Sequence, residues 1–346
     1  MKTLAAILVK TGEPLVVEEI EVPALKRGQV LVEVTFSGVC HTQVSECRGH
    51  RGQDHYLPHC LGHEGSGVVL EVGEAVTKVT PGDRVLLSWI KGSGGDVPGS
   101  VYESKRGSIN AGGITTFSRH AVVSENRLTV LPASVSSRDA AILGCAVPTG
   151  IGAVLNTAQA MSGQSAVIFG VGGVGLCAVA GAVIAGCNPV VAVDINKEKL
   201  KAATVFGATH ALCVNGSDTL ANLRDICKNG FDFAIEASGR TQSMTLALES
   251  VRNQGGKAVV VGNARHGEML EIDPRQLNQG KQLRGTWGGD NDPDRDFPKY
   301  FEYLASGKLN LDLLTSNCFP LSQINQAIED LERGKCLRPL IEMSVE

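Results

Sequence analysis

A run of glycines between two apolar segments constrains the fold of this chain more than any other feature. The run, Gly170-Val-Gly-Gly-Val-Gly175, follows the apolar segment Ala166–Phe169 and opens a stretch of small residues that ends at Ala185. A second apolar segment, Val190–Val193, ends in Asp194. Two short apolar runs joined by a small-residue helix are typical of parallel strands that are buried on both faces and connected by a crossover helix.

The same alternation continues to residue 261 and predicts one parallel sheet. Helical patterns and strand-like runs follow each other here, with helices expected at 197–206, 219–228 and 241–251 and strands at 211–214, 231–236 and 257–261. Alternating strands and helices form a doubly wound parallel sheet of the Rossmann type. We therefore expect an α/β domain over residues 148–287.

The glycine run has the spacing of a dinucleotide-binding turn. Gly170, Gly172 and Gly175 stand between a predicted strand and a predicted helix, and an acidic residue closes the next strand. Such glycines allow a tight turn and a close approach of pyrophosphate to the helix N-terminus. Asp194 would bind both hydroxyls of an adenosine ribose and repel a 2′-phosphate, which predicts NAD rather than NADP. Two alternatives stay open: the glycine run is only a packing turn in a sheet, or Asp194 simply caps the helix that follows it.

The segments on either side of this domain have a different pattern. Strand-like runs separated by Gly and Pro turns come before it, at 30–34, 67–72 and 84–87. We therefore expect a mainly antiparallel β domain over residues 1–147. Two helical patterns and a terminal strand come after it, at 296–306, 321–333 and 340–343. Because 346 residues exceed one usual hydrophobic core, we expect two domains, with residues 288–346 returning to the first.

Composition disfavours several classes of protein. Lysine and arginine total 32 against 36 acidic residues, a net charge of −4, which argues against a nucleic-acid binder. Residues 140–193 contain no charged side chain and could be read as a membrane segment, but the glycines and the turn at Asn188-Pro189 favour strands and a helix. The N-terminus has no secretory signal pattern, so the ten cysteines are expected to be reduced thiols of a cytoplasmic protein.

Three short segments outside the glycine run carry a family resemblance. Gly62-His63-Glu64-Gly65 lies between strand-like runs, Cys40-His41-Thr42 precedes it, and Cys145 lies in Leu143-Gly-Cys-Ala-Val-Pro-Thr-Gly150. Together with the glycine run and the C-terminal Cys336-Leu-Arg338, these segments make the chain resemble the zinc-dependent medium-chain alcohol dehydrogenases from end to end.

The resemblance implies a GroES-like fold for the β domain and a zinc-dependent reaction. Cys40, His63 and Cys145 would hold a catalytic zinc with an open fourth position, although spacing alone leaves Cys47 and Cys60 as further candidate ligands. The zinc would stabilise the alkoxide of an alcohol, which then passes hydride to NAD.

The resemblance also implies roles for residues around the zinc and the cofactor. Thr42 would start a proton relay, and Glu64 would support the metal site or act as an occasional fourth ligand. His41 and Arg338 would contact the pyrophosphate. The other implied contacts are Gly173 in the glycine run, Lys199 at the ribose, Arg240 beside the cofactor, Thr149 and Val174 at the nicotinamide, and Trp89 in the substrate pocket.

The sequence departs from the family pattern at three places. Residues 91–113 lack the four cysteines of a second, structural zinc, so we expect one zinc per chain. Gln43 replaces an aspartate that orients the zinc-bound histidine, which should make His63 a weaker donor and the zinc more electrophilic. Ser45 replaces a histidine that ends the proton relay, so solvent is expected to take the proton directly. The family also implies a homo-oligomer, either a dimer or a tetramer.

These residues predict oxidation of an alcohol or reduction of its carbonyl, and they leave the substrate open. Arg48 and Arg51 lie in a polar stretch that would either select an anionic substrate, such as a glutathione adduct or a sugar derivative, or form a solvated loop. Two other functions compete with the main hypothesis. A zinc-free quinone or enone reductase would lack the Cys40, His63 and Cys145 set, and a non-catalytic protein on the same scaffold would bind NAD without turning over a substrate.

Overall fold

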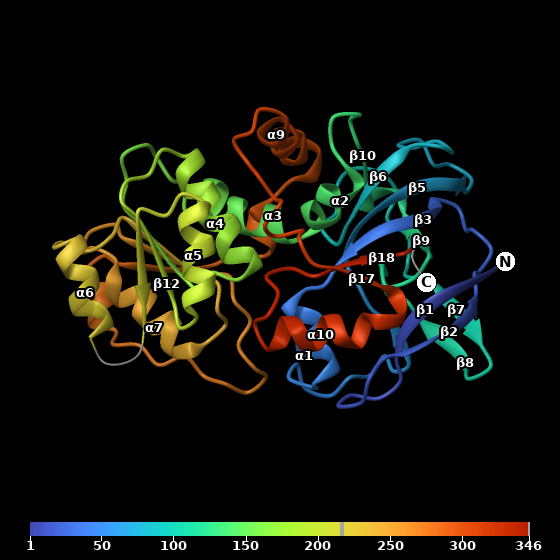
Figure 1. Ribbon diagram of the computed structural model, residues 1–346, viewed down its shortest axis with the longest axis horizontal. Coiled ribbons are helices and arrows are strands. Elements are labelled where there is room, and N and C mark those ends of the chain that lie inside the picture. The colour runs from blue at the N-terminus through green and yellow to red at the C-terminus, as the bar shows by residue number, and fades with distance from the viewer. Residues whose placement is uncertain (215–217, 345–346) are drawn as a thin grey trace. The chain divides into compact units, whose positions relative to one another are not determined.

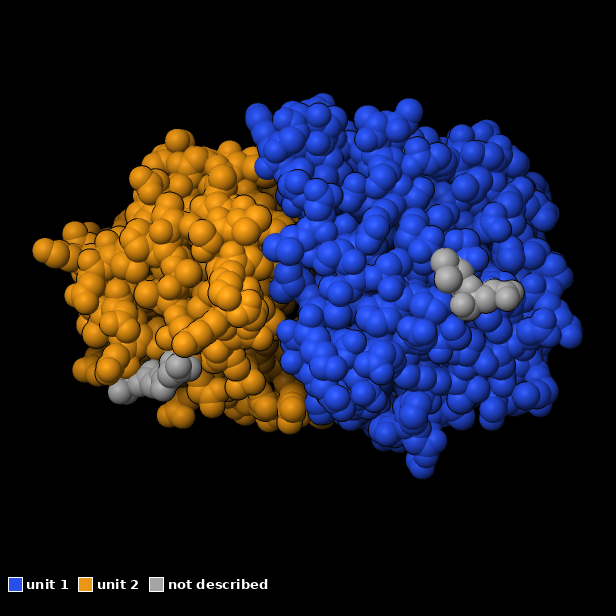
Figure 2. Space-filling model, in the orientation of Figure 1, with its two compact units in different colours: residues 1–145, 292–346 blue, residues 146–291 orange. Residues whose placement is uncertain are grey.

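The chain forms two compact units in the computed structural model, which describes residues 1–214 and 218–344 (Figure 2). Unit 1 comprises Met1–Cys145 and Asp292–Glu346, and unit 2 comprises Ala146–Asn291. Unit 1 is therefore built from two segments that are distant in sequence, whereas unit 2 is one continuous segment between them.

Unit 2 contains a six-stranded parallel sheet (Figure 1). Its strand order is β13-β12-β11-β14-β15-β16, so the first strand along the chain lies in the middle and the order reverses beside it. The strands are β11 (Ala166–Phe169), β12 (Val190–Asp194), β13 (His210–Cys213), β14 (Phe233–Glu236), β15 (Lys257–Val260) and β16 (Gln282–Gly285). This topology confirms the doubly wound Rossmann fold. Sequence analysis missed β16, whose Gln-Leu-Arg-Gly sequence is not an apolar run.

Helices connect these strands and cover the sheet. Both β11 and β14 are buried along their whole length, as strands with helices on both faces should be. The helices of unit 2 are α3 (Ala146–Gly152), α4 (Gly173–Ile184), α5 (Lys197–Val205), α6 (Thr219–Ile226), α7 (Thr241–Ser250) and α8 (Arg275–Asn278). α3 packs closely on α4, because a Cβ atom at Gly150 would overlap the carbonyl oxygen of Val174 and only glycine fits there.

The glycine run makes the turn between β11 and α4. Gly170 has φ +81, a left-handed conformation that favours glycine, and Gly172 is the N-cap residue of α4. A Cβ atom at Gly175 would overlap the Gly170 carbonyl oxygen, whereas a Cβ atom at Gly172 would meet no atom within 4 Å. The three glycines therefore serve different purposes: Gly170 and Gly175 close the turn, and Gly172 leaves open space beside the helix N-terminus.

Unit 1 combines a closed barrel with a second sheet, mainly antiparallel as expected for a GroES-like domain. The barrel order is β1-β2-β7-β8-β4, with bounds Lys2–Leu8, Val16–Glu21, Val101–Ser104, Gly107–Asn110 and His59–Cys60. The second sheet has the order β10-β6-β5-β3-β18-β17, with bounds Leu128–Val130, Arg84–Ser88, Glu64–Val72, Gln29–Gly38, Leu340–Glu342 and Cys318–Pro320, and β9 (His120–Ser124) also pairs with β3. The hairpin β7-β8 lies in the segment 91–113, where no strand was expected.

The C-terminal segment completes unit 1. β18 pairs with β3 in antiparallel register, Leu340 opposite Gly38, and so sets Arg338 near the end of β3. One face of α10, with Ile324, Ile328 and Leu331, packs into the same apolar core as Val44. The helices of unit 1 are α1 (His41–Cys47), α2 (Ser137–Ala140), α9 (Pro293–Ala305) and α10 (Ile324–Glu332).

The long uncharged stretch of the sequence folds as several short elements. In the described part of the chain, no single helix is long and apolar enough to cross a membrane. One bent pair of helical segments, Ser137–Gly144 and Ala146–Thr157, meets the length and composition criteria only when taken together.

The contrast between two glycines of one turn gives a stability prediction. Gly175→Ala is expected to lower the thermal unfolding midpoint by several degrees, because the new methyl group meets the Gly170 carbonyl oxygen and such overpacking costs about 1–3 kcal/mol. Gly172→Ala is the matched control and should lower the midpoint much less, since its Cβ atom enters open space and only the preference of an N-cap for glycine over alanine is lost. Scanning calorimetry of both variants checks this, and equal losses would contradict the packing role of Gly175.

Candidate metal and dinucleotide sites

Three side chains of unit 1 form a buried cluster that could hold a metal ion. One ligand atom each from Cys40, His63 and Cys145 lies within 4.8 Å of the other two. Cys40 follows β3 and is the N-cap residue of α1, His63 immediately precedes β5, and Cys145 follows the 3-10 turn Ala141–Gly144. The two cysteines are only 6% and 7% exposed. The structure thus brings together the three residues that the family resemblance singled out.

Glycines bring these segments close to one another. Gly62 has φ +90, and a Cβ atom there would lie 2.7 Å from the Phe117 backbone nitrogen. A Cβ atom at Gly144 would overlap the Leu87 carbonyl oxygen and approach Glu64 Cβ to 2.9 Å. A larger residue at either position would push a ligand-bearing segment away, so these glycines help to place His63 and Cys145.

The cluster has a donor set suited to zinc. Two thiols and one imidazole are ligands that this borderline-soft ion prefers, and three protein ligands leave a position open for a substrate. His63 Nε2 is buried and makes no hydrogen bond within the described residues. The Gln43 side-chain nitrogen lies 2.6 Å from His63 Nδ1, so the other ring nitrogen of His63, Nε2, is the one left for a metal. The residues present therefore fit a zinc ion.

The thiol pKa values distinguish the clustered cysteines from two others. The hydrogen bond from the Cys145 thiol, followed by the nearby Arg338 charge, holds the pKa of Cys40 well below its usual range despite burial. The same contact raises the pKa of Cys145. Cys47 and Cys60 lie outside the cluster, and burial raises the pKa of each to about 12. These two thiols therefore behave as buried apolar residues of unit 1.

Behind the cluster lies a buried ion pair that sequence analysis missed. Arg338 Nε lies 2.7 Å and its terminal nitrogen 2.5 Å from Glu64 Oε1, and both side chains are almost fully buried. Burial opposes the charge of Arg338, but Cys40, Glu64 and Cys145 more than offset it and raise its pKa. The structure therefore places Arg338 in the interior of unit 1, against Glu64 and the thiols. A sequence carries no local signal for this contact, which joins residues far apart along the chain.

The remaining predicted residues of unit 1 lie around the cluster. Thr42 Oγ1 is 3.6 Å from Cys40 Sγ, so its hydroxyl borders the cluster. His41 is exposed on α1, and Ser45 is partly exposed on the same helix. Trp89, one residue after β6, is partly buried, and its carbonyl oxygen accepts a hydrogen bond from Arg127.

The polar stretch that contains Arg48 and Arg51 is held by ion pairs. Arg48 makes hydrogen bonds of 2.7–3.2 Å to both carboxylate oxygens of Glu332, and Arg51 lies 2.9 Å from Glu46. Each arginine is thus already neutralised by a carboxylate of the same unit. This arrangement disfavours the idea that the two arginines attract an anionic substrate.

In unit 2, Asp194 is bonded directly to the glycine turn. Its Oδ2 accepts the Val171 N–H at 2.8 Å, and its Oδ1 accepts the Asn196 N–H at 2.9 Å. Each carboxylate oxygen can accept a further hydrogen bond, as ribose hydroxyls require. Asn196, not Asp194, caps α5 by accepting from the Glu198 and Lys199 N–H groups. The capping alternative for Asp194 is therefore wrong, and its carboxylate remains available beside the turn.

The other predicted cofactor residues of unit 2 lie on three helices and at the N-cap of a fourth. The Thr149 hydroxyl on α3 is buried and makes no hydrogen bond within the described residues, so it can bond to a ligand. Gly173 and Val174 begin α4, and Lys199 is partly exposed on α5. Arg240 is exposed at the N-cap of α7.

Sequence analysis overlooked Glu236 at the end of β14. This fully buried carboxylate accepts the Ser238 and Gly239 N–H groups at 2.8 and 3.0 Å through Oε1, and burial raises its pKa. A Cβ atom at Gly170 would lie 2.7 Å from Ser238 Cβ, so the turn that Glu236 holds packs against the glycine run. Glu236 is an acidic residue at the end of a strand, as Asp194 is, and this position in the sequence could have identified it.

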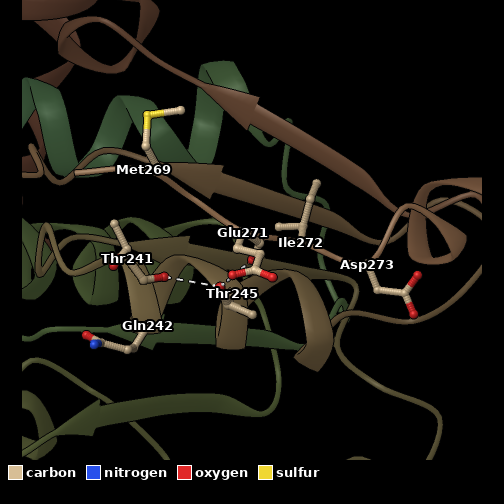
Figure 3. A pocket seen from close by; sticks show the side chains of 7 residues that line it. All are labelled: Thr241, Gln242, Thr245, Met269, Glu271, Ile272 and Asp273. Carbon is tan, nitrogen blue, oxygen red and sulfur yellow. Dashed lines mark hydrogen bonds between the residues drawn. The ribbon is translucent and has the colours of Figure 1, made fainter. Parts of the chain in front are cut away.

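An open pocket of about 540 Å³ also lies in unit 2 (Figure 3). Thr241, Gln242 and Thr245 of α7 line one side, and Figure 3 shows Thr245 beside Glu271 of the facing segment. Thr245 Oγ1 donates to the carbonyl oxygens of Thr241 and Glu271 at 3.2 and 3.1 Å. None of the predicted site residues lines this pocket, although Arg240 immediately precedes it in sequence.

Comparisons with known proteins show which family the chain resembles over both units. Residues 26–133 match the alcohol dehydrogenase GroES-like domain, and residues 173–306 match the zinc-binding dehydrogenase family. An S-(hydroxymethyl)glutathione dehydrogenase of Escherichia coli strain CFT073 is 34% identical over 370 residues, which covers 99% of this chain and 100% of that protein.

Solved structures show the same fold over nearly the whole chain. An alcohol dehydrogenase zinc-binding domain protein from Burkholderia ambifaria has a TM-score of 0.91 and 29% identity, with 99% of each chain covered. Benzyl alcohol dehydrogenase from Acinetobacter calcoaceticus has a TM-score of 0.90 and 26% identity, also with 99% of each chain covered.

The Glu64–Arg338 pair leads to a second stability prediction. Arg338→Met removes the guanidinium that pairs with the buried Glu64 carboxylate and should cost about 3–5 kcal/mol of unfolding free energy. Arg48→Met removes the partly exposed pair with Glu332 and should cost about 0–1 kcal/mol. Urea unfolding of both variants in chelator-treated protein separates ion-pair loss from metal loss. Equal destabilisation would show that burial of the Glu64 pair is not decisive.

Proposed function

We propose that this chain, which belongs to the zinc-dependent medium-chain alcohol dehydrogenases, transfers hydride between an alcohol and NAD beside a zinc ion held by Cys40, His63 and Cys145. The observation that carries the proposal is the buried cluster of these three side chains, with ligand atoms within 4.8 Å of one another. A zinc-free reductase of the same superfamily would not require these three metal-binding side chains, and a non-catalytic protein would not require an open position on the metal.

The metal and the residues around it would have different roles in the reaction. A zinc ion in this position supplies a Lewis acid for an alcohol or carbonyl oxygen. Thr42, whose hydroxyl lies beside Cys40, accepts the alcohol proton and passes it outward. Glu64 and Arg338 keep the charge behind the thiolates balanced, and the pairing of Glu64 leaves the three cluster residues as the metal ligands.

One zinc per chain is part of the proposal. The segment 91–113 contains no cysteine, and it provides the barrel strands β7 and β8 of unit 1. The only group of His, Cys and acidic side chains that fits a metal among the described residues is the Cys40, His63 and Cys145 cluster.

NAD would be held by the glycine turn and by Asp194. The open space beside Gly172 accepts the pyrophosphate at the N-terminus of α4, and Asp194 receives the ribose hydroxyls with the lone pairs left by its two backbone contacts. The unpartnered Thr149 hydroxyl supplies a polar contact for the nicotinamide. Because Arg48 and Arg51 are already paired, an uncharged alcohol is the substrate class that we favour.

Metal content and turnover test the proposed function together. Purified protein should carry about one zinc per chain and oxidise benzyl alcohol with NAD. Cys145→Ser should lose both the zinc and the activity, whereas Cys60→Ser should keep both, because Cys60 is a buried cysteine of the same unit outside the cluster. Elemental mass spectrometry and absorbance at the NADH band measure the two quantities. Zinc that survives Cys145→Ser, or zinc without any alcohol turnover, would overturn the proposal.

Cofactor choice gives an independent prediction. Asp194→Ser removes the carboxylate that repels a 2′-phosphate, so KM for NAD should rise about tenfold or more and the preference for NAD over NADP should shrink. The serine hydroxyl retains an acceptor near the Val171 N–H, and circular dichroism checks that the turn still folds. An unchanged NAD to NADP ratio of kcat/KM would exclude Asp194 from ribose recognition.

A further inference from the structure

A single buried amide links two of the three cluster residues. The Gln43 side chain is 2% exposed, and its Oε1 accepts the backbone N–H of Cys40 at 3.1 Å. Its Nε2 lies 2.6 Å from His63 Nδ1. Cys40 is the N-cap residue of α1, so its N–H has no acceptor within the helix and depends on this side chain.

The Cys40 N–H determines which way the amide points. A backbone N–H only donates, so it must face the amide oxygen, and the amide NH2 group must then face His63. The NH2 group also only donates, so Nδ1 is the acceptor. The proton of a neutral His63 ring therefore lies on Nε2, the nitrogen that the contact with Gln43 leaves for the cluster.

Zinc binding at His63 Nε2 requires the other tautomer of the imidazole ring. The metal takes the Nε2 lone pair, so the proton of a neutral imidazole lies on Nδ1 and needs an acceptor. In the observed orientation that N–H would point at the Gln43 NH2 group, a second donor. Reversing the amide provides the acceptor but turns the NH2 group toward the Cys40 N–H. A glutamine can therefore satisfy one of these two N–H groups, and never both, when zinc is bound.

We propose that Gln43 is a positioning residue whose amide reverses when zinc binds, so that metal binding removes the hydrogen bond to the Cys40 N–H. This inference rests on the zinc site of the proposed function. Its consequence is a lower zinc affinity than the three ligands would otherwise have, because a buried N–H group left without an acceptor is unfavourable. A glutamate at position 43 has two acceptor oxygens and would satisfy both N–H groups at once in the zinc-loaded protein.

Zinc affinity, measured by competition with a chromogenic chelator, tests the proposal in the full chain. Gln43→Glu should bind zinc about 10–100-fold more tightly than the wild type. Gln29→Glu is the matched control, since Gln29 is a glutamine of the same unit, 3% exposed, whose Oε1 accepts the Lys26 N–H and whose Nε2 donates to Ser100. Its zinc affinity should equal that of the wild type.

A second readout separates hydrogen bonding from the added negative charge. In zinc-loaded protein labelled with 15N-cysteine, the Cys40 amide proton should resonate upfield in the wild type relative to Gln43→Glu, because only the variant keeps an acceptor for it. Gln43→Met makes neither hydrogen bond in either state, so zinc binding costs this variant none, and it should bind zinc at least as tightly as the wild type. It also covers the case in which Gln43→Glu does not fold. A glutamine that simply supports His63 predicts weaker binding in Gln43→Met.

Several results would overturn the inference. They are an unchanged zinc affinity in Gln43→Glu, an equal gain in Gln29→Glu, identical Cys40 resonances in wild type and Gln43→Glu, or weakened binding in Gln43→Met. A wild-type protein that binds no zinc overturns the proposed function together with this inference. Zinc binding and turnover with any of the four results above overturns the inference alone.

Discussion

The buried pair of Glu64 and Arg338 is the interaction on which the rest of unit 1 depends. An isolated carboxylate at the start of β5 would be too costly to bury, and the guanidinium that neutralises it comes from the C-terminal segment after α10. The pair therefore joins two parts of unit 1 that are distant in sequence. It also places a positive charge beside two thiols that must become thiolates to bind a metal, so the same contact serves folding and metal chemistry.

Backbone geometry, more than side-chain packing, assembles the three ligand residues. Cys40 starts a helix, and His63 follows Gly62, which has a left-handed backbone conformation. Cys145 follows a 3-10 turn that ends in Gly144, where a side chain would collide with Glu64. Each ligand residue thus follows or starts a backbone turn whose conformation helps to set its position. The cofactor turn of unit 2 follows the same principle, because Gly170 and Gly175 close it while Gly172 keeps one side open.

Periodic and local features could be predicted from the sequence, whereas long-range contacts could not. The strand β11, with bounds Ala166–Phe169, and the doubly wound topology followed from apolar runs and glycine spacing. The short strands β7, β8 and β16 were missed, since they have four residues each and no apolar run. The Glu64–Arg338 and Arg48–Glu332 pairs join residues hundreds of positions apart, so only the folded chain reveals them. The clustering of Cys40, His63 and Cys145 could be anticipated from a family resemblance but not from spacing.

The polar groups around the cluster explain why a supporting residue can change while the ligands keep their places. Backbone elements hold Cys40 and Cys145, and the Gln43 side chain accepts the Cys40 N–H at the start of α1. What residue 43 decides is which N–H groups find an acceptor in each state of the site. A glutamine satisfies both partners without metal, whereas a carboxylate would satisfy both with metal. If the amide reverses as proposed, the side chain at this position sets the balance between the metal-free and metal-loaded forms.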